Sequence, residues 1–286
     1  MAAIQISIKG GADRPQPAST TRAAGMTDTG FSLPVNGYAM AMAVDAVLFD
    51  LDDTCYPYPP CNEAGKEAAW RTARELGYDF DREAFDAFYR EGRRDVKRDA
   101  AETAASHDRF LYFKRALERH AGTHRSGDAL AMGEAYWAAF VDELEPFPGV
   151  TETFATLADR DVDVAIVTNL TTRIQLEKLD AMGLDEYVDL LVTSEELGRE
   201  KPASLMFTHP LARLDRRPSE TVMVGNSIRS DIEGANAVGI ETVLFNGDGD
   251  ADSGGDDPAS ADPTLESHRK PDHRIDSFRD VLEVIR

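Results

Sequence analysis

From residue 44 onward, short apolar runs alternate with helix-like stretches. The run at 44–49 leads directly into acidic residues, as a buried strand of a parallel sheet does when it ends at a site. Further runs lie at 162–167, 188–193, 221–225 and 240–245, and helix-like stretches at 151–160, 172–182, 203–214 and 228–238. Ile275 starts or extends a last short strand, and a helix follows over 278–285. The alternation predicts an α/β fold with a doubly wound, parallel, Rossmann-like sheet.

One segment, residues 61–144, interrupts this alternation with helix after helix. Its apolar residues recur three and four positions apart, which is the period of a helix. The stripes comprise Trp70, Ala73 and Leu76; Phe85, Phe88 and Tyr89; Phe110, Phe113 and Leu117; and Leu130, Tyr136, Trp137 and Phe140. The sequence therefore predicts a smaller, all-helical cap at 61–144, inserted into an α/β core made of 44–60 and 145–286.

Two segments lack apolar periodicity. Residues 1–43 are rich in Gly, Pro, Ser and Thr, and are interpreted as a disordered tail or as an N-terminal extension upstream of a start at Met40 or Met42. Residues 246–271 are rich in Gly, Asp, Ser and Pro, and are expected to form a flexible acidic loop. The loop starts like a calcium-binding loop but lacks its spacing of glycine and distant glutamate, so solvation is favoured over metal binding.

The composition narrows the class of protein. Hydrophobic residues make up 42% of the 286 residues, enough for a packed core, and no run approaches the roughly 18 apolar residues of a membrane-spanning helix. Lys and Arg number 31 against 52 Asp and Glu, a net charge of -21. Such a field repels nucleic acid and anionic lipid, so we expect neither as a partner. The two cysteines, Cys55 and Cys61, exclude a disulfide scaffold and fit a reducing cytoplasm.

Only seven of the basic residues are lysines. Excess acid with scarce lysine predicts a halophilic protein that stays soluble in high salt, where self-repulsion is screened. An ordinary acidic enzyme is the alternative.

The strongest chemical signal is the sequence DLDDT at 50–54, after the first strand. Ligands of open α/β sheets bind beyond the carboxyl ends of the strands. A carboxylate such as Asp50 can attack phosphorus and form an acyl-phosphate, which water later cleaves. A second carboxyl, that of Asp52, can protonate the leaving oxygen and then activate that water. The alternative is that these acidic residues after the strand only cap a helix.

The sequence FDLDDT at 49–54 resembles the first motif of the haloacid dehalogenase-like superfamily, and the resemblance covers most of 44–286. It implies that Asp50 is the nucleophile and Asp52 the general acid/base, with the Asp52 backbone carbonyl bound to Mg²⁺. Dehalogenases of this superfamily need no leaving-group acid and lack the second aspartate. Because this chain keeps Asp52, the resemblance favours the phosphatase branch.

The resemblance extends to two phosphate-binding motifs. In VAIVTN at 164–169, the Thr168 hydroxyl and the backbone N–H groups that follow it, from Asn169 on, suit a phosphate oxygen. In GREKP at 198–202, Lys201 would neutralise the phosphate and reduce its repulsion from Asp50. The alternative is that Lys201 is an ordinary surface lysine, which is less expected because lysine is rare in this sequence.

The sequence VMVGNSIRSD at 222–231 resembles the superfamily's metal motif, with Asn226 in place of its first aspartate. A carboxamide oxygen still ligates Mg²⁺ or holds a ligating water, with one negative charge less. The implied metal ligands are thus Asp50, Asp52, Asn226 and Asp231. This oxygen set suits a hard cation.

We therefore expect a cytoplasmic, Mg²⁺-dependent phosphomonoesterase that acts on a small soluble phosphorylated metabolite. Phosphoglycolate, sugar phosphates and nucleoside monophosphates all remain open, and Tyr56 mildly resembles the pyrimidine nucleotidase-like members. Residues 56–58 fall where the family has a mobile flap, a place for substrate contacts. A phosphomutase and a catalytically silent scaffold that binds a partner through its cap are the alternatives. The histidines His107, His120 and His124 are interpreted as surface residues and Cys55 as a packing residue.

Overall fold

The computed structural model describes residues 43–247 and 266–285, and its sheet is parallel throughout. The strands are β1 (Ala46–Phe49), β2 (Asp163–Thr168), β3 (Leu190–Thr193), β4 (Thr221–Gly225), β5 (Glu241–Phe245) and β6 (His273–Ile275), in the order β3-β2-β1-β4-β5-β6. The chain first builds outward from β1 to β3 and then crosses to the other side for β4. This order confirms the predicted doubly wound α/β fold, and its switch point lies between β1 and β4.

The central strand β1 is buried on both faces of the sheet. Val47 and Phe49 point into one hydrophobic core and Leu48 into another, as the twofold period of a strand requires. The Phe49 ring lies 4.7 Å from Phe154 and 5.5 Å from Phe278. A strand with no polar face must be covered on both sides, so helices from both halves of the chain hold the start of the DLDDT motif in place.

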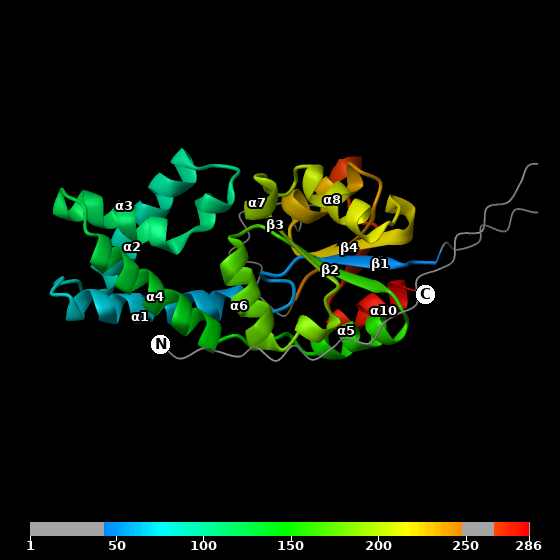
Figure 1. Ribbon diagram of the computed structural model, residues 1–286, viewed down its shortest axis with the longest axis horizontal. Helices are drawn as coiled ribbons and strands as arrows, with labels where there is room; N and C mark the ends of the chain where they lie inside the picture. The colour runs from blue at the N-terminus through cyan, green and yellow to red at the C-terminus, as the bar shows by residue number, and fades with distance from the viewer. Residues whose placement is uncertain (1–42, 248–265, 286) are drawn as a thin grey trace, which may run out of the picture. The chain divides into compact units, whose positions relative to one another are not determined.

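Helices cover the two faces of the sheet, with α5, α6 and α10 on one side and α8 on the other (Figure 1). The core helices are α5 (Val150–Asp159), α6 (Thr172–Met182), α7 (Ser194–Leu197), α8 (Leu205–Leu214), α9 (Gly234–Asn236) and α10 (Val281–Val284). Shorter turns are η2 (Asp185–Tyr187), η3 (Pro218–Glu220), η4 (Ile228–Glu233), η6 (Ser267–Arg269) and η7 (Phe278–Asp280).

A helical domain is inserted after β1. It contains α1 (Tyr58–Glu75), α2 (Arg82–Asp99), η1 (Ala104–His107), α3 (Arg109–Ala121) and α4 (Ser126–Asp142), with α1 packed on α4 and α2 on α3. Aromatic rings fill its interior: Tyr136 lies 5.1 Å from Trp137 and 6.0 Å from Phe140. The chain enters and leaves the insertion at neighbouring points, because the Phe147 N–H donates to the Cys55 carbonyl at 2.9 Å.

Ile275 ends β6, so it extends the last strand, as one of the two predicted options has it. Two other predicted details were wrong. The stretch 228–238 is not one α-helix: it begins as the π-helical turn η4, in which the Ile232 N–H reaches back five residues to the Ser227 carbonyl. Leu76 and Leu130, assigned to apolar stripes, are 42% and 53% exposed, because Leu76 lies just past the end of α1 and Leu130 on the outer face of α4.

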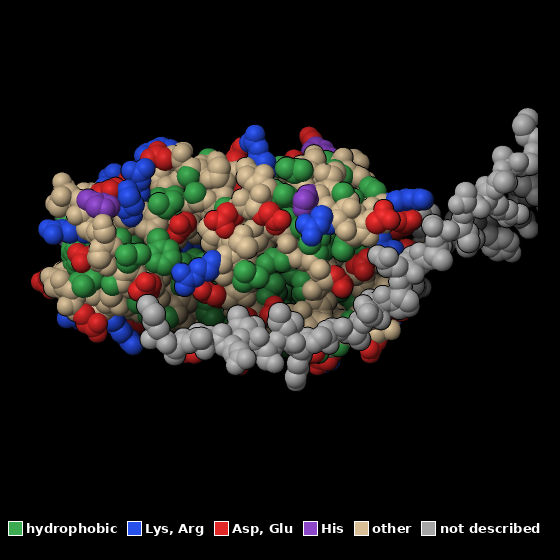
Figure 2. All heavy atoms as spheres, viewed as in Figure 1, with side chains coloured by type: hydrophobic (Ala, Val, Ile, Leu, Met, Phe, Trp, Pro, Cys, Tyr) green, Lys and Arg blue, Asp and Glu red, His purple; other side chains and the backbone are tan. Residues whose placement is uncertain are grey.

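The tail at 1–42 and the loop positions 248–265 lie outside the described residues, so those predictions stay open. The end of the predicted loop, 267–269, forms the turn η6. Over the described residues, every helix is too short or too polar to cross a lipid bilayer. On the face drawn in Figure 2, acidic and basic side chains are interspersed rather than gathered by sign.

Candidate active site

The carboxyl ends of β1, β2 and β4 open into a pocket of about 960 Å³. Phe49 pairs with Ile166 on one side and with Val224 on the other, so the residues after these strands leave the sheet side by side. The segment 97–107 of the insertion supplies the opposite wall. The pocket therefore lies between the sheet and the helical domain, at the switch point of the fold.

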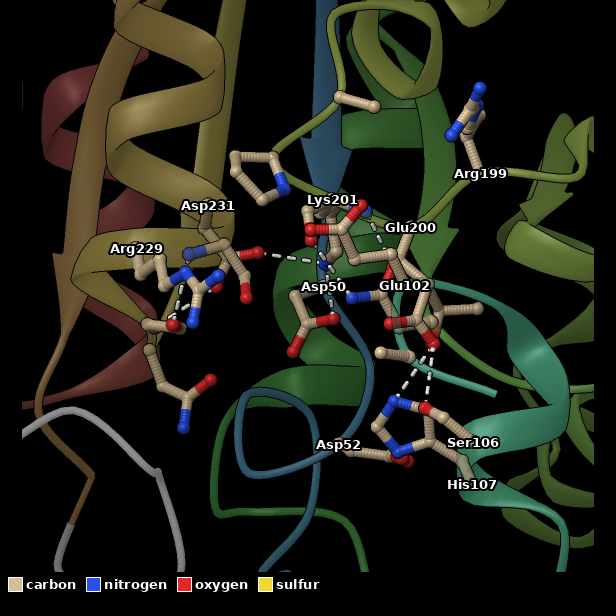
Figure 3. Close-up of a pocket in the computed structure, with 18 of the residues that line it drawn as sticks. Asp50, Asp52, Glu102, Ser106, His107, Arg199, Glu200, Lys201, Arg229 and Asp231 are labelled. Atoms are coloured by element: carbon tan, nitrogen blue, oxygen red, sulfur yellow. Dashed lines mark hydrogen bonds and ion pairs between the residues drawn. The ribbon is translucent and has the colours of Figure 1, made fainter. Parts of the chain in front are cut away.

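Lys201 is a buried cation between two carboxylates at the base of this pocket (Figure 3). Its Nζ lies 2.5 Å from Asp50 Oδ1 and 2.7 Å from Asp231 Oδ1. Burial alone would lower the pKa of Lys201, but the two carboxylates outweigh it and raise that pKa, so the side chain is charged. Burial raises the pKa of Asp50 to about 7 although Lys201 opposes it, and the charge of Asp231 adds to the rise. The cluster thus has more negative charge than one lysine balances.

Asp231 reaches this position through a close approach to the backbone. Its Oδ2 accepts the Ser227 N–H at 2.9 Å, inside the wide turn η4. A Cβ on Gly225 would lie 2.3 Å from the same oxygen, so only glycine leaves room for it. The Gly-Asn-Ser sequence at 225–227 therefore shapes the backbone around one carboxylate as well as supplying the Asn226 side chain.

Oxygen atoms suited to a hard cation converge on the Thr54 hydroxyl. Thr54 Oγ1 lies 3.1 Å from Asp50 Oδ2 and 3.4 Å from Asn226 Oδ1. A hydroxyl has one proton, so Thr54 can donate to only one of these two oxygens, and the other oxygen receives no hydrogen bond from it. Within residues 43–247 and 266–285, no three His, Cys, Asp or Glu side chains gather to hold a metal by themselves. A cation here would depend on the Asn226 amide and on backbone oxygen in addition to carboxylate, and that donor set fits Mg²⁺.

Asp52 has a second, separate cation. Lys178 of α6 donates from Nζ to Asp52 Oδ1 at 2.6 Å, and the Tyr56 hydroxyl donates to the same oxygen. Burial would raise the pKa of Asp52, but the charge and hydrogen bond of Lys178 outweigh it and hold that pKa below its usual value. Burial also lowers the pKa of Lys178, although the Asp52 charge opposes this. The structure thus gives Asp50 and Asp52, two residues apart, different electrostatic surroundings.

The predicted phosphate-binding residues line the same pocket. Thr168 Oγ1 accepts a hydrogen bond from Gln175 Nε2 at 2.6 Å, which leaves the Thr168 proton to be donated elsewhere. The Asn169 side chain is engaged with the chain itself: its Oδ1 accepts the Lys201 N–H at 2.8 Å. Its amide therefore fixes the backbone that holds Lys201, and only its backbone N–H stays a predicted phosphate donor.

The wall contributed by the insertion is polar. Glu200 Oε1 lies 2.9 Å from His107 Nε2 and accepts the Ser106 hydroxyl at 3.3 Å, while Arg199 points away from Asp50 (Figure 3). Lys97 Nζ lies 3.2 Å from the His107 ring nitrogens and 3.4 Å from Ser106 Oγ. Burial and the nearby Lys97 lower the pKa of His107, although Glu200 opposes this. This cluster joins the insertion to the residue before Lys201.

The structure brings every predicted site residue to this pocket: Asp50, Asp52, Thr168, Asn169, Lys201, Asn226 and Asp231 all line it. The interpretation of His107 as a surface residue was wrong, whereas His120 and His124 are exposed. Cys55 is buried, and burial raises its thiol pKa, as a packing residue requires. Sequence reasoning missed Lys178 and Gln175 altogether.

A sequence profile described as haloacid dehalogenase-like hydrolase matches residues 44–239, and a second, HAD-hydrolase-like profile matches 198–281. The chain belongs to the haloacid dehalogenase-like hydrolase family, as its fold and its first motif indicate. Its insertion after β1 is the helical cap of that family. It is a phosphatase, a hydrolase of phosphomonoesters.

Two curated relatives span almost the same length. The chain is 58% identical over 240 residues to ribulose-1,5-bisphosphate 5-phosphatase of Halopiger xanaduensis, covering 84% of this chain and 98% of that protein. It is 32% identical over 243 residues to glyceraldehyde 3-phosphate phosphatase of Methanopyrus kandleri, covering 85% of this chain and 97% of that protein.

Solved structures share the fold. A HAD-hydrolase of Bacillus subtilis bound to magnesium matches with a TM-score of 0.61 at 19% identity, over 85% of this chain and 99% of that chain. A HAD phosphatase of Thermococcus onnurineus matches with a TM-score of 0.59 at 24% identity, over 84% and 97%. At these identities the likeness extends to the fold alone.

Proposed function

We propose that the chain removes the phosphate of a sugar phosphate through a phosphorylated Asp50, with Mg²⁺ as cofactor. The observation that carries this proposal is the cluster of Asp50, Lys201 and Asp231 at the end of the central strand. A buried lysine beside a carboxylate lets a phosphate dianion approach a group that would otherwise repel it. The 58% identity to ribulose-1,5-bisphosphate 5-phosphatase makes ribulose 1,5-bisphosphate the first substrate to test.

In the first step, an Asp50 oxygen attacks phosphorus while the bond from phosphorus to the sugar oxygen breaks. Lys201 holds positive charge beside Asp50 throughout, so it offsets the charge of the incoming phosphate. Thr168 can donate its proton to a phosphoryl oxygen, because Gln175 already supplies the hydrogen bond that its own oxygen accepts. The product of this step is an aspartyl-phosphate and a sugar hydroxyl.

Asp52 serves both steps as acid and then as base. It gives its proton to the leaving sugar oxygen, and it later removes a proton from the water that attacks the aspartyl-phosphate. Lys178 favours the carboxylate form of Asp52, which suits the second step. A phosphate dianion bound nearby acts the other way, because like charge raises the pKa of a carboxyl group. Substrate binding therefore favours protonated Asp52 before phosphoryl transfer.

For the metal, we propose Asp50, Asn226, Asp231 and the backbone carbonyl of Asp52 as ligands. Mg²⁺ bound there would stabilise negative charge on the transferring phosphoryl group. Both oxygens of Asp231 already accept hydrogen bonds, from Lys201 and from Ser227. Asn226 therefore offers the less occupied oxygen of the metal motif at 222–231, although it lacks the charge of an aspartate.

The cap wall suits a substrate with a second anionic group. Ser106 and His107 already contact one carboxylate, that of Glu200, and Lys97 lies against both. Phosphate oxygens need the same kind of donors. A bisphosphate with its reacting phosphate at Asp50 would extend across the pocket, and its other phosphate would compete with Glu200 for this wall.

The experiment is phosphate release by the purified full chain from ribulose 1,5-bisphosphate, glyceraldehyde 3-phosphate and a pyrimidine nucleoside monophosphate, with and without Mg²⁺. We expect Mg²⁺-dependent release, fastest from the bisphosphate, with ³¹P NMR of the product showing which phosphate has left. A mutase would transfer the phosphoryl group to a sugar and release little phosphate. A silent scaffold would release none, and either outcome contradicts the proposal.

A further inference from the structure

Lys178 is a buried cation for which the family resemblance gave no role. It lies on α6, one helical turn after Gln175, and its side chain is 1% exposed. Its partner is Asp52, at 2.6 Å. A single helix thus supplies the donor to Thr168 and the cation beside Asp52, and both contacts end in the pocket.

Aromatic rings enclose this ammonium group. Nζ lies 5.1 Å from the ring centre of Phe140, 5.5 Å from that of Tyr56 and 5.9 Å from that of Trp137. Phe140 and Trp137 belong to α4 of the cap, whereas Lys178 and Tyr56 belong to the core side. The Asp52–Lys178 pair therefore lies where the cap meets the core.

A purely structural role accounts poorly for a charge in this place. Removing an ammonium group from water is costly, and an ion pair with a carboxylate that is itself 27% exposed returns that cost only in part. Cation–π attraction to the three rings offsets a further part of that cost when the rings exclude water. A methionine of similar length would fill the ring-lined space without the desolvation cost. The charge of Lys178 is therefore better explained by a role in the chemistry of Asp52.

Both hydrogen bonds that hold the Asp52 side chain end on one oxygen. Lys178 and Tyr56 donate to Oδ1. Among residues 43–247 and 266–285, the structure shows no donor to Oδ2. Since Asp52 lines the pocket, Oδ2 is the oxygen left for proton transfer.

We propose that Lys178 is a positioning residue, which fixes Asp52 by one oxygen so that the other meets the leaving sugar oxygen and later the attacking water. This inference rests on the proposed acid/base role of Asp52. Tyr56 shares the task, and the cap rings keep water from competing for the ammonium group. Lys178 itself does not contact the reacting atoms.

The test compares two substrates that differ in how much they need an acid. Phenyl phosphate has a more basic leaving oxygen than 4-nitrophenyl phosphate, so it depends more on protonation by Asp52. The measured quantity is kcat/KM, which covers all steps through departure of the leaving group. We expect Lys178→Met to lower kcat/KM for phenyl phosphate by about ten-fold or more beyond its effect on 4-nitrophenyl phosphate, since general acid catalysis contributes about 10²–10⁴-fold.

A double-mutant cycle separates positioning from a general effect. If Lys178 acts through Asp52, then Lys178→Met added to Asp52→Asn should change kcat/KM by less than about two-fold. Lys178→Gln keeps a donor without the charge and should fall between Lys178→Met and the wild type. Lys114→Met is the control, because Lys114 pairs with Glu118 on the cap surface and should show no substrate-dependent effect.

Two results would overturn the inference: an equal loss on both substrates, or a loss that adds to that of Asp52→Asn. The thermal unfolding midpoint shows whether each variant is folded, and Lys178→Gln replaces Lys178→Met in the cycle if the latter does not fold. Full activity of Asp52→Asn on phenyl phosphate would instead contradict the proposed function, so the two failures are distinguishable.

Discussion

Two buried lysines support the two carboxylates of the first motif in different ways. Lys201 lies between Asp50 and Asp231, and the core alone supplies all three residues. Lys178 pairs with Asp52, but two of the rings around it come from the cap helix α4. The core alone therefore provides the surroundings of Lys201, whereas the core and the cap together provide those of Lys178.

This difference separates two parts of the proposed reaction. The surroundings of Asp50, which is to attack phosphorus, do not need the cap. The surroundings of Asp52, which is to move protons, change with the cap because α4 shields Lys178 from water. Substitutions can therefore affect phosphorus chemistry and proton supply independently. The predictions below test this separation and the metal site beside it, from the largest expected effect to the smallest.

Removal of the nucleophile should have the largest effect. Asp50→Asn should lower kcat by at least about 10⁴-fold on every substrate, because loss of a covalent nucleophile is not compensated by leaving-group reactivity. The measurement is steady-state phosphate release from 4-nitrophenyl phosphate and from a sugar phosphate. Residual activity that favours the aryl ester would show that Asp50 is not the attacking group.

Loss of the core lysine comes next. Lys201→Met should lower kcat/KM by about 10²–10³-fold to a similar extent on good and poor leaving groups. It should also destabilise the fold by about 3–5 kcal/mol, because it leaves two buried carboxylates uncompensated.

The stability deficit of Lys201→Met should depend on pH. The pKa of Asp50 is already raised in the folded chain, and loss of the cation raises it further. A carboxyl with a raised pKa binds more protons in the folded than in the unfolded chain, which lowers the stability of the fold as the pH rises. In the variant this loss continues to higher pH than in the wild type, so the deficit should be largest above pH 7 and should shrink as the pH falls. Urea unfolding at several pH values measures it, and a pH-independent deficit would contradict the charge explanation.

Asn226→Asp should have a moderate effect that is confined to the metal. A carboxylate attracts Mg²⁺ more strongly than an amide oxygen does, so the Mg²⁺ concentration for half-maximal activity should fall about three- to ten-fold. The added negative charge also opposes an anionic substrate, so the maximal rate need not rise. The experiment is a Mg²⁺ titration of both proteins at fixed ionic strength. An unchanged midpoint would place residue 226 away from the metal and its waters.

The smallest effect should come from the cap ring farthest from Lys178. Trp137→Leu should lower kcat/KM for phenyl phosphate about two- to five-fold relative to 4-nitrophenyl phosphate, as expected for loss of the cation–π contact between Trp137 and Lys178. The variant also loses the contact of Trp137 with Arg109, at 5.0 Å. Trp70→Leu is the matched control: Trp70 also lies in the cap, beside Arg74, but on α1 and away from Lys178. Equal substrate ratios in both variants would show that the cap ring does not act on Asp52.

The sequence predicted the parts of this arrangement that depend on local pattern. Short apolar runs located the strands, and the acids after the first run located the site, because both follow from burial and from where a parallel sheet ends. Lys201 was found partly because lysine is scarce, and the structure confirms that it is buried.

The same scarcity could have pointed to Lys178, but its helix resembles an ordinary exposed one. A helix with arginine, glutamate and lysine at 173, 177 and 178 gives no local sign that one of these charges is buried. Burial of Lys178 arises from packing of α4, which is far away in sequence. His107 was misjudged for a similar reason, because Glu200 lies almost a hundred residues later. The interpretations of high charge as salt adaptation and of a cytoplasmic location stay predictions.

The hydrogen bond between the Phe147 N–H and the Cys55 carbonyl has a consequence for how such enzymes diversify. The two chain segments that connect the core to the cap meet at this hydrogen bond. A different insertion therefore needs to join only two neighbouring points, and no strand of the sheet has to change its place. Recombination or engineering can therefore exchange the cap as a unit while Asp50, Lys201 and Asp231 are inherited intact. Lys178 sets a limit on that exchange. A new cap without rings over α6 would expose Lys178 to water, and on the proposed role of Lys178 we expect slower turnover of the phosphate esters whose leaving groups need a proton.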